Sequence, residues 1–202
     1  EMCIRDSKAL HKKEVVEYKQ QANVMNEKNI MLMCHHPFIL ALYNTYKTDH
    51  KLYMLLEYCN GGELFGRLHT NSRDGVTNAQ HAKFYCGCCT LALGYLLQRK
   101  IIYRDLKPEN LLVTKDKMGR DTIKLADFGC ACNVERPHGY AAAGPPEAGG
   151  AQERLVTMAR STPSYVAPEL LSNTRSHSRA SDFWAFGALL HEMAAGAPPY
   201  AM

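Results

Sequence analysis

This sequence lacks three features: long hydrophobic runs, a signal-peptide pattern and a basic tract. No stretch approaches the run of about 18 apolar residues that a membrane-spanning helix needs, so we expect no membrane span. The N-terminal residues show no signal-peptide pattern, and the two absences together favour a cytoplasmic or nuclear protein, of which we expect the cytoplasmic one. The formal net charge of +4 is spread along the chain, which argues against binding to nucleic acid.

Paired metal-binding cysteines are also missing, although the chain contains 8 cysteines. Cys86, Cys88 and Cys89 crowd into one predicted helix, but at this spacing their side chains spread around it and converge poorly on one zinc ion. No paired Cys/His knuckle follows them. The pattern favours buried free thiols, with a metal–thiol protein as the alternative.

At 202 residues, 46% of them hydrophobic, the chain is long enough for one domain or for two small lobes that share a cleft. Residues 11–33 are rich in helix formers and predict one helix, whereas residues 1–7 do not read as a strand. Residues 38–59 predict a β-hairpin with its turn at Thr48–His50.

The second part of the chain reads as mostly helical, after a breaker and predicted hinge at "NGGE" (60–63). Residues 110–113 and 122–129 predict two short strands, and 183–195 is apolar nearly all round, which predicts a buried helix. A capping box at Thr77 opens another helix. The apolar stripe of that helix is predicted at Phe84, Cys88, Leu91 and Tyr95. The order of elements predicts an α+β fold with a break near residue 59.

The stretch "IIYRDLKPENLLV" (101–113) places several charges between two apolar runs. Phosphoryl transfer needs oxygen ligands for Mg²⁺, cations that meet phosphate charge, and a carboxylate that orients the attacking hydroxyl. Asn110 and Asp127 can supply the oxygen ligands from two adjacent predicted strand ends. Asp105 can accept the hydroxyl proton, and Lys107 can neutralise the migrating phosphate.

Four motifs occur in order: "YRDLKPEN", "DFG", "APE" (167–169) and "SDFWAFG" (181–187). Over residues 8–200, apart from the insert, the chain resembles the catalytic domain of eukaryotic Ser/Thr protein kinases. Tyr103, where His is more usual, and "KQQANVMNEKNIM" (19–31) resemble the cyclic-nucleotide-dependent kinases, the cGMP-dependent ones first and the cAMP-dependent ones next. The resemblance implies a bilobal protein kinase-like fold with ATP and Mg²⁺ as cofactors.

The resemblance also implies roles for individual residues. Asp105 corresponds to the catalytic base, Lys107 to the phosphate-contacting lysine, and Asn110 and Asp127 to the metal ligands. Lys8 and Glu27, 19 residues apart, correspond to the lysine and glutamate that pair at the ATP site. The adenine is expected at Leu56, Glu57, Cys59 and Leu112. A stack between the lobes, or plain core packing, is expected at Met31, Leu42, Tyr103 and Phe128, and Asp182 is expected to brace the catalytic-loop backbone.

Substrate choice and regulation follow from the same resemblance. Glu63, Glu109 and Glu192 match acids that face basic residues ahead of a target Ser or Thr, and the alternative is three solvated surface acids. Thr162 matches the threonine that marks Ser/Thr specificity. Arg104 would pair with a phosphate on the activation segment, where Thr157 is the candidate acceptor. A cyclic-nucleotide-binding regulatory domain or subunit is the implied partner, besides protein substrates.

Two departures from the family pattern shape the expected domains. No Gly-rich loop is present, so we expect a truncated N-lobe over 1–58. The sequence stops at Met202, so we expect a C-lobe over 59–202 that lacks its last helices. The activation segment carries an insert at about 135–155, where 11 of the 13 residues in 139–151 are Ala, Gly or Pro and predict a mobile loop. A non-catalytic kinase-like scaffold, or an inactive truncated fragment, is therefore the alternative to an active kinase.

Overall fold

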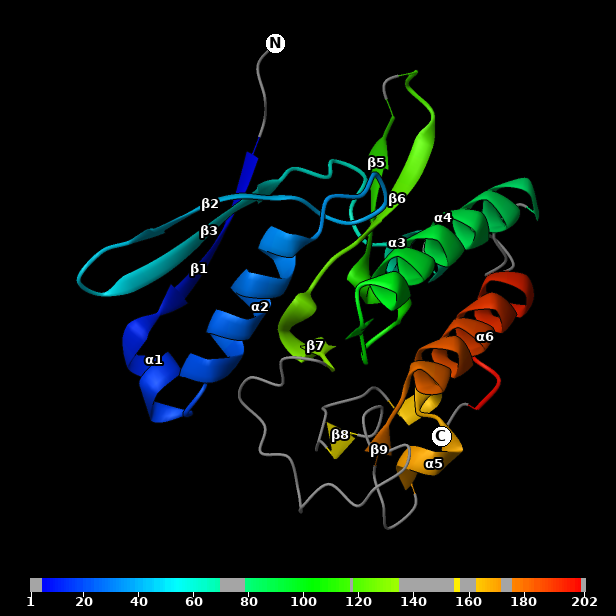
Figure 1. The fold of residues 1–202 in the computed structure, drawn as a ribbon. Helices are drawn as coiled ribbons and strands as arrows, with labels where there is room; N and C mark the ends of the chain where they lie inside the picture. Colours follow the sequence, from blue (N-terminus) through cyan, green and yellow to red (C-terminus); the bar gives the residue numbers. More distant parts are fainter. Residues whose placement is uncertain are drawn as a thin grey trace.

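The computed structural model describes residues 5–69, 79–116, 118–134, 155–156, 163–171 and 176–200. Its N-terminal part is a three-stranded antiparallel sheet with helices packed beside it, and its C-terminal part is mostly helical (Figure 1). The predicted α+β class is confirmed. None of the described helices is long and apolar enough to cross a membrane.

The N-terminal sheet has the strand order β1-β3-β2, with β1 at Arg5–His11, β2 at Leu42–Lys47 and β3 at Lys51–Glu57. The predicted hairpin of β2 and β3 is confirmed. The expectation that residues 1–7 form no strand is wrong for residues 5–7, because Arg5, Asp6 and Ser7 pair with Glu57, Leu56 and Leu55. Residues 1–4 lie outside the described residues. β1 lies at an edge of the sheet, where polar residues are tolerated.

The single helix predicted over 11–33 is also wrong. The structure contains two helices, α1 at Lys12–Glu17 and α2 at Gln21–Met33. Between them Lys19 has a φ of 53°, a left-handed conformation that ends α1. Helix propensity favoured one helix because a single left-handed residue leaves no mark in a run of good helix formers.

The C-terminal part begins with α3 and α4. Helix α4 runs beside α6 (Figure 1). Strands β5 and β6 form the antiparallel pair expected from the sequence, in the register Leu111↔Leu125. The elements in chain order are α3 (Leu64–His69), α4 (Ala79–Gln98), β4 (Ile101–Ile102), η1 (Pro108–Asn110), β5 (Leu111–Lys115), β6 (Asp121–Leu125), η2 (Phe128–Cys130), β7 (Cys132–Asn133), β8 (Leu155–Val156), η4 (Pro163–Tyr165), α5 (Pro168–Leu171), β9 (Ser176–His177) and α6 (Arg179–Ala195).

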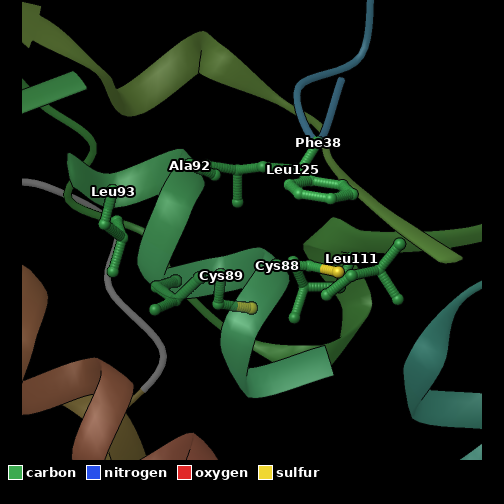
Figure 2. Close-up of a pocket in the computed structure, with 9 residues that line it drawn as sticks. Phe38, Cys88, Cys89, Ala92, Leu93, Leu111 and Leu125 are labelled. Carbon is green, nitrogen blue, oxygen red and sulfur yellow. The ribbon is translucent and has the colours of Figure 1, made fainter. Parts of the chain in front are cut away.

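The core beneath β5 and β6 is filled from α4 and from Phe38 (Figure 2). Cys88 and Cys89 are buried there as free thiols. The predicted stripe of α4 is wrong in part, because Phe84 and Leu91 are 43% and 57% exposed. α4 packs against both β6 and α6, which turns a neighbouring set of residues inward: Tyr85, Cys88, Cys89, Ala92, Leu93 and Leu96.

Helix α6 is only partly buried, which corrects the expectation of a fully buried helix. Phe183 and Trp184 are 46% and 38% exposed, and the ring of Trp184 stacks on that of Tyr200. Ala185, Ala188 and Leu189 form its buried face. A helix whose residues are apolar on all sides is therefore not necessarily buried on all sides.

The segment after β3 is tied to β5 by two backbone hydrogen bonds. Gly61 N–H donates to the carbonyl of Val113 (2.8 Å), and Val113 N–H donates to the carbonyl of Gly62 (2.7 Å). A Cβ on Gly61 would lie 2.6 Å from the carbonyl oxygen of Val113, and Gly62 has a φ of +71°. In the Gly-Gly pair, predicted as a hinge, Gly61 is thus required by a close backbone approach and Gly62 by its left-handed backbone conformation.

Gly61→Ala is expected to destabilise the chain by about 1–3 kcal/mol, because the added methyl meets fixed backbone. Gly66→Ala, in α3, is the matched control, since a Cβ there meets nothing within 4 Å. We expect Gly66→Ala to be neutral or to stabilise by up to about 1 kcal/mol. Urea unfolding of both variants measures the difference, and equal stabilities would contradict the required close approach.

Candidate active site

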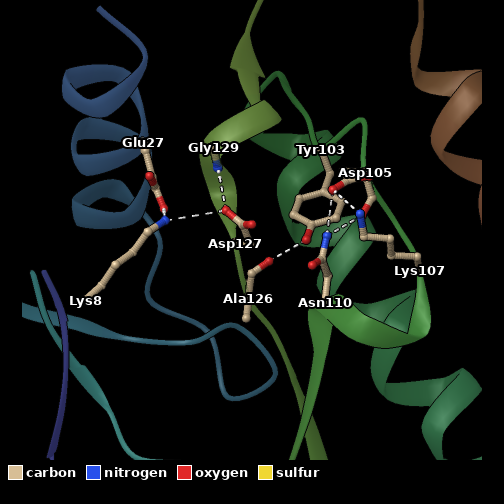
Figure 3. Close-up of polar contacts among 9 residues, drawn as sticks. All are labelled: Lys8, Glu27, Tyr103, Asp105, Lys107, Asn110, Ala126, Asp127 and Gly129. Atoms are coloured by element: carbon tan, nitrogen blue, oxygen red, sulfur yellow. Dashed lines mark hydrogen bonds and ion pairs between the residues drawn. The ribbon is translucent and has the colours of Figure 1, made fainter. Parts of the chain in front are cut away.

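Lys8 joins the N-terminal sheet to the rest of the site (Figure 3). Its Nζ lies 2.7 Å from Oε1 of Glu27 on α2 and 3.7 Å from Oδ1 of Asp127. Burial lowers the pKa of the Lys8 ammonium, but the charges and hydrogen bonds of Glu27 and Asp127 outweigh it and raise the pKa overall. The pairing of Lys8 with Glu27 implied by the resemblance is present, and Lys8 remains a cation at neutral pH.

Asp127 stands at the start of η2 in a left-handed conformation, with a φ of 48°. Its Oδ1 accepts a hydrogen bond from the N–H of Gly129 (3.2 Å), which fixes the carboxylate relative to the turn. The side chain is 54% exposed, so a charged ligand can approach it. A left-handed residue other than glycine typically costs about 1–3 kcal/mol and marks a position that the surrounding structure enforces.

Asp105, Lys107 and Asn110 form a second cluster, which Figure 3 shows across from Lys8. Lys107 Nζ lies 2.9 Å from Oδ2 of Asp105, and Asn110 Nδ2 donates to the same oxygen (2.9 Å) and to the Asp105 carbonyl (2.8 Å). The pKa of the Asp105 carboxyl is raised, mainly by burial. The contacts with Lys107 and Asn110 lower this pKa, and the charge of Asp127 raises it further. A carboxylate with a raised pKa and a fixed orientation can act as a proton acceptor.

The backbone of this cluster is held by Asp182 of α6. The N–H groups of Tyr103 and Arg104 donate to its two carboxylate oxygens at 2.8 and 2.7 Å. Arg104 itself has a φ of 73°. The predicted brace is confirmed, and it holds a left-handed residue directly before Asp105.

The predicted apolar stack lies behind these groups. Met31, Leu42, Tyr103 and Phe128 are all buried, and the rings of Tyr103 and Phe128 pack edge to face at 5.3 Å. The Tyr103 hydroxyl donates to the carbonyl of Ala126, which precedes Asp127. Tyr103 therefore ties the segment before Asp105 to the segment that carries Asp127.

The chemistry of Asn110 and Asp127 fits Mg²⁺. Asn110 uses its amide nitrogen to hold Asp105, so its side-chain oxygen is the atom left for a metal. Asp127 contributes a half-exposed carboxylate. One carboxylate and one amide oxygen, completed by phosphate oxygens, is the kind of donor set that Mg²⁺ takes in nucleotide sites.

The four residues expected around the adenine lie at and after the end of β3 and on β5. Leu56, Cys59 and Leu112 are half-buried and pack against the core. The carboxylate of Glu57 is turned to Lys124, 2.7 Å away on β6, and its N–H donates to the carbonyl of Ala41. Lys124 was missed from the sequence, because nothing local marks a pair between β3 and β6.

The three predicted substrate-facing acids lie in different surroundings. Glu63 is exposed and forms an isolated β-bridge with Leu112. Glu109 has a buried Oε2 without a hydrogen-bond partner among the described residues. Glu192 is 1% exposed and is held by His69 and Tyr165, neither of which the sequence had marked.

The guanidinium of Arg104 donates to the carbonyls of Cys130 and Ala131. It therefore links the segment between β4 and η1 to the end of η2. Helix α2 reaches the same segment, since Asn26 Nδ2 donates to the carbonyl of Ala131 (2.8 Å). Thr157 and Thr162 lie outside the described residues, as does most of the 135–155 insert. The pairing of Arg104 with a phosphorylated threonine stays a prediction.

Comparison with known proteins agrees with this geometry. Residues 4–202 match the protein kinase domain model. The chain is 40% identical over 198 residues to the cAMP-dependent protein kinase catalytic subunit of Dictyostelium discoideum, covering 98% of this chain and 26% of that protein. It is 39% identical over 193 residues to cGMP-dependent protein kinase, isozyme 1, of Drosophila melanogaster, covering 96% of this chain and 22% of that one. It is 38% identical over 195 residues to Danio rerio serine/threonine-protein kinase Sgk1, covering 96% of this chain and 40% of that one.

Proposed function

Because this chain belongs to the protein kinase domain family, we propose that it is catalytic and transfers the γ-phosphate of ATP to serine or threonine of protein substrates. The chain spans about a quarter of the length of the first two relatives named above and two fifths of the third. One observation carries the proposal. Lys8, held by Glu27 and close to Asp127, shares a site with the Asp105–Lys107–Asn110 cluster.

Each side chain has a separate task in the proposed reaction. Lys8 supplies a fixed cation for the phosphates of the nucleotide, and Glu27 prevents it from swinging away. Asp105 orients the substrate hydroxyl and accepts its proton, while Lys107 meets the charge of the phosphoryl group in transfer. Mg²⁺, when held by Asn110 and Asp127, would neutralise phosphate charge and align the leaving oxygen.

The proposed substrates carry basic residues before the target Ser or Thr. Glu63, Glu109 and Glu192 are the proposed partners of these basic residues, because a guanidinium binds carboxylates in a bidentate way. The buried Oε2 of Glu109, which has no partner among the described residues, supports the idea of an incoming donor. Thr162 completes this proposal as the residue for Ser/Thr specificity.

We also propose that a cyclic nucleotide regulates the full-length protein, with cGMP as the first candidate and cAMP as the second. It is supported by likeness to relatives whose names include cGMP-dependent and cAMP-dependent kinases. Adding cGMP or cAMP to the full-length protein tests it, and activation by neither would contradict it. A cytoplasmic location stays a prediction.

The central proposal is tested by transfer of labelled γ-phosphate from ATP to a peptide with two arginines before a serine. We expect transfer that requires Mg²⁺ and stops when the metal is chelated. A chain that binds nucleotide and peptide yet transfers no phosphate would favour the scaffold alternative.

A further inference from the structure

An ion pair joins the N-terminal sheet to β6 beside the expected adenine site. Lys124 Nζ on β6 lies 2.7 Å from Oε1 of Glu57 at the end of β3, and the two side chains are 13% and 23% exposed. The other carboxylate oxygen of Glu57, Oε2, accepts a hydrogen bond from the N–H of Ala41 (3.3 Å). Because both charges are largely withdrawn from water, replacing one of them would leave the other partly buried without its ionic partner. The pair therefore restrains the end of β3 more than an exposed surface pair would.

The end of β3 has a second connection to β6, which is made by the backbone. Glu57 N–H donates to the carbonyl of Ala41 (2.9 Å). In the segment that leads to Ala41, Leu40 N–H donates to the carbonyl of Leu125, and Leu125 N–H donates to the carbonyl of Phe38, both at 2.9 Å. These bonds do not involve the ion pair, so we expect the fold to survive its removal while the end of β3 gains freedom to move.

The same ion pair borders the residues expected around the adenine. Lys124 is the register partner of Leu112 on β5, and directly opposed residues of an antiparallel pair project from the same face. Both charges act on Cys59, whose thiol pKa is raised to about 11, mainly by burial. The charge of Glu57 also raises that pKa, and the charge of Lys124 lowers it. The pair therefore lies next to Leu112 and Cys59.

We infer that Lys124 is a positioning residue for the base of the nucleotide. It holds the carboxylate of Glu57 and so fixes the backbone from Glu57 to Cys59 relative to Leu112. A base that binds there meets a preset site and does not have to order the end of β3. The inference rests on the proposed function, which places ATP at this site.

Lys124→Met in the full-length protein tests the inference, because it keeps the unbranched aliphatic stem and removes the charge. We expect the Kd and the KM for ATP to rise roughly three- to tenfold, with kcat at saturating ATP within about twofold of wild type. Displacement of a fluorescent ATP analogue by ATP and by adenosine shows where the loss arises. The same fold-change is expected for both ligands, and a loss confined to ATP would overturn the positioning of the base.

Three more variants complete the comparison. Lys124→Arg keeps the ion pair, so we expect ATP binding close to that of wild type. Glu57→Gln removes the other charge and should weaken binding by a factor similar to that of Lys124→Met. Lys115→Met is the matched control, because it breaks a pair of the same length, 2.7 Å to Asp121, and should leave the Kd for ATP unchanged.

The outcomes separate this inference from the kinase proposal. An unchanged Kd and KM in both Lys124→Met and Glu57→Gln would overturn the role of Lys124 and leave the kinase proposal intact. A lower kcat with an unchanged KM would mean that the pair is only structural, and it would overturn the role as well. If the wild-type protein binds ATP but transfers no phosphate, the kinase proposal fails, whereas weaker binding of ATP and adenosine by Lys124→Met would still support the positioning role.

Discussion

Asp105→Asn is expected to lower kcat for phosphate transfer by about 10²- to 10⁴-fold, the range that a positioned general base contributes. The change keeps the size of the side chain but removes its ability to accept a proton and its ion pair with Lys107. Lys8, Glu27 and Asp127 are untouched, so nucleotide binding should persist. Steady-state kinetics, together with titration of a fluorescent ATP analogue, separate the two effects.

Asp116→Asn is the matched control for this experiment. Asp116 lies in the turn after β5, where its carboxylate accepts hydrogen bonds from the N–H groups of Met118 and Arg120 and pairs with the Arg120 guanidinium. Among the described residues, its side-chain contacts stay within this turn, and we expect kcat to remain within about twofold of wild type. If Asp105→Asn lost as little activity as this control, Asp105 would not be the base and the scaffold alternative would gain support.

The sequence predicted best those parts of the site that lie on regular elements. The hairpin β2–β3 and the strands β5 and β6 follow from local periodicity, and Asn110 and Asp127 lie just before β5 and just after β6. The pair of Lys8 and Glu27 was implied by the resemblance to protein kinases and not by local periodicity. β1 itself was missed because an edge strand with polar residues has no alternating pattern.

The features that the sequence did not predict depend on contacts between distant segments or on single backbone angles. Glu57 meets Lys124 across two different sheets, and His69 meets Glu192 from 123 residues away. The left-handed residues Lys19, Arg104 and Asp127 carry no signature in residue type. Periodicity records which face of an element is apolar, and it holds no information on which distant side chain covers that face.

Removal of Asp182 is expected to have the largest effect on stability among the changes considered. Asp182→Ala leaves the N–H groups of Tyr103 and Arg104 without acceptors in a buried region, which should cost about 3 kcal/mol or more. It also releases the left-handed Arg104, so kcat should fall together with stability. Urea unfolding at pH 7.5 measures the first effect, and a stability equal to wild type would contradict the bracing role.

The pH dependence of stability gives a second measure of the same residue. Burial raises the pKa of Asp182 to about 6, although the N–H groups of Tyr103 and Arg104 and the Arg104 charge oppose the rise. The folded chain therefore keeps a proton that the unfolded chain, with an ordinary aspartate pKa near 4, has already lost. The contribution of this group is most favourable below about pH 4 and declines, by on the order of 3 kcal/mol, as pH rises through about 6.

Asp182→Asn isolates that contribution, because it keeps one acceptor oxygen and does not titrate. The difference in unfolding free energy between wild type and this variant should change between about pH 4 and pH 6 and stay level above about pH 7. Other carboxyl groups, such as Asp121, have lowered pKa values and act in the opposite direction, but they are common to both proteins and cancel in the difference. A difference that is constant from pH 4 to pH 7 would mean that Asp182 holds the loop with an ordinary carboxylate, and that its two N–H bonds fully offset its burial.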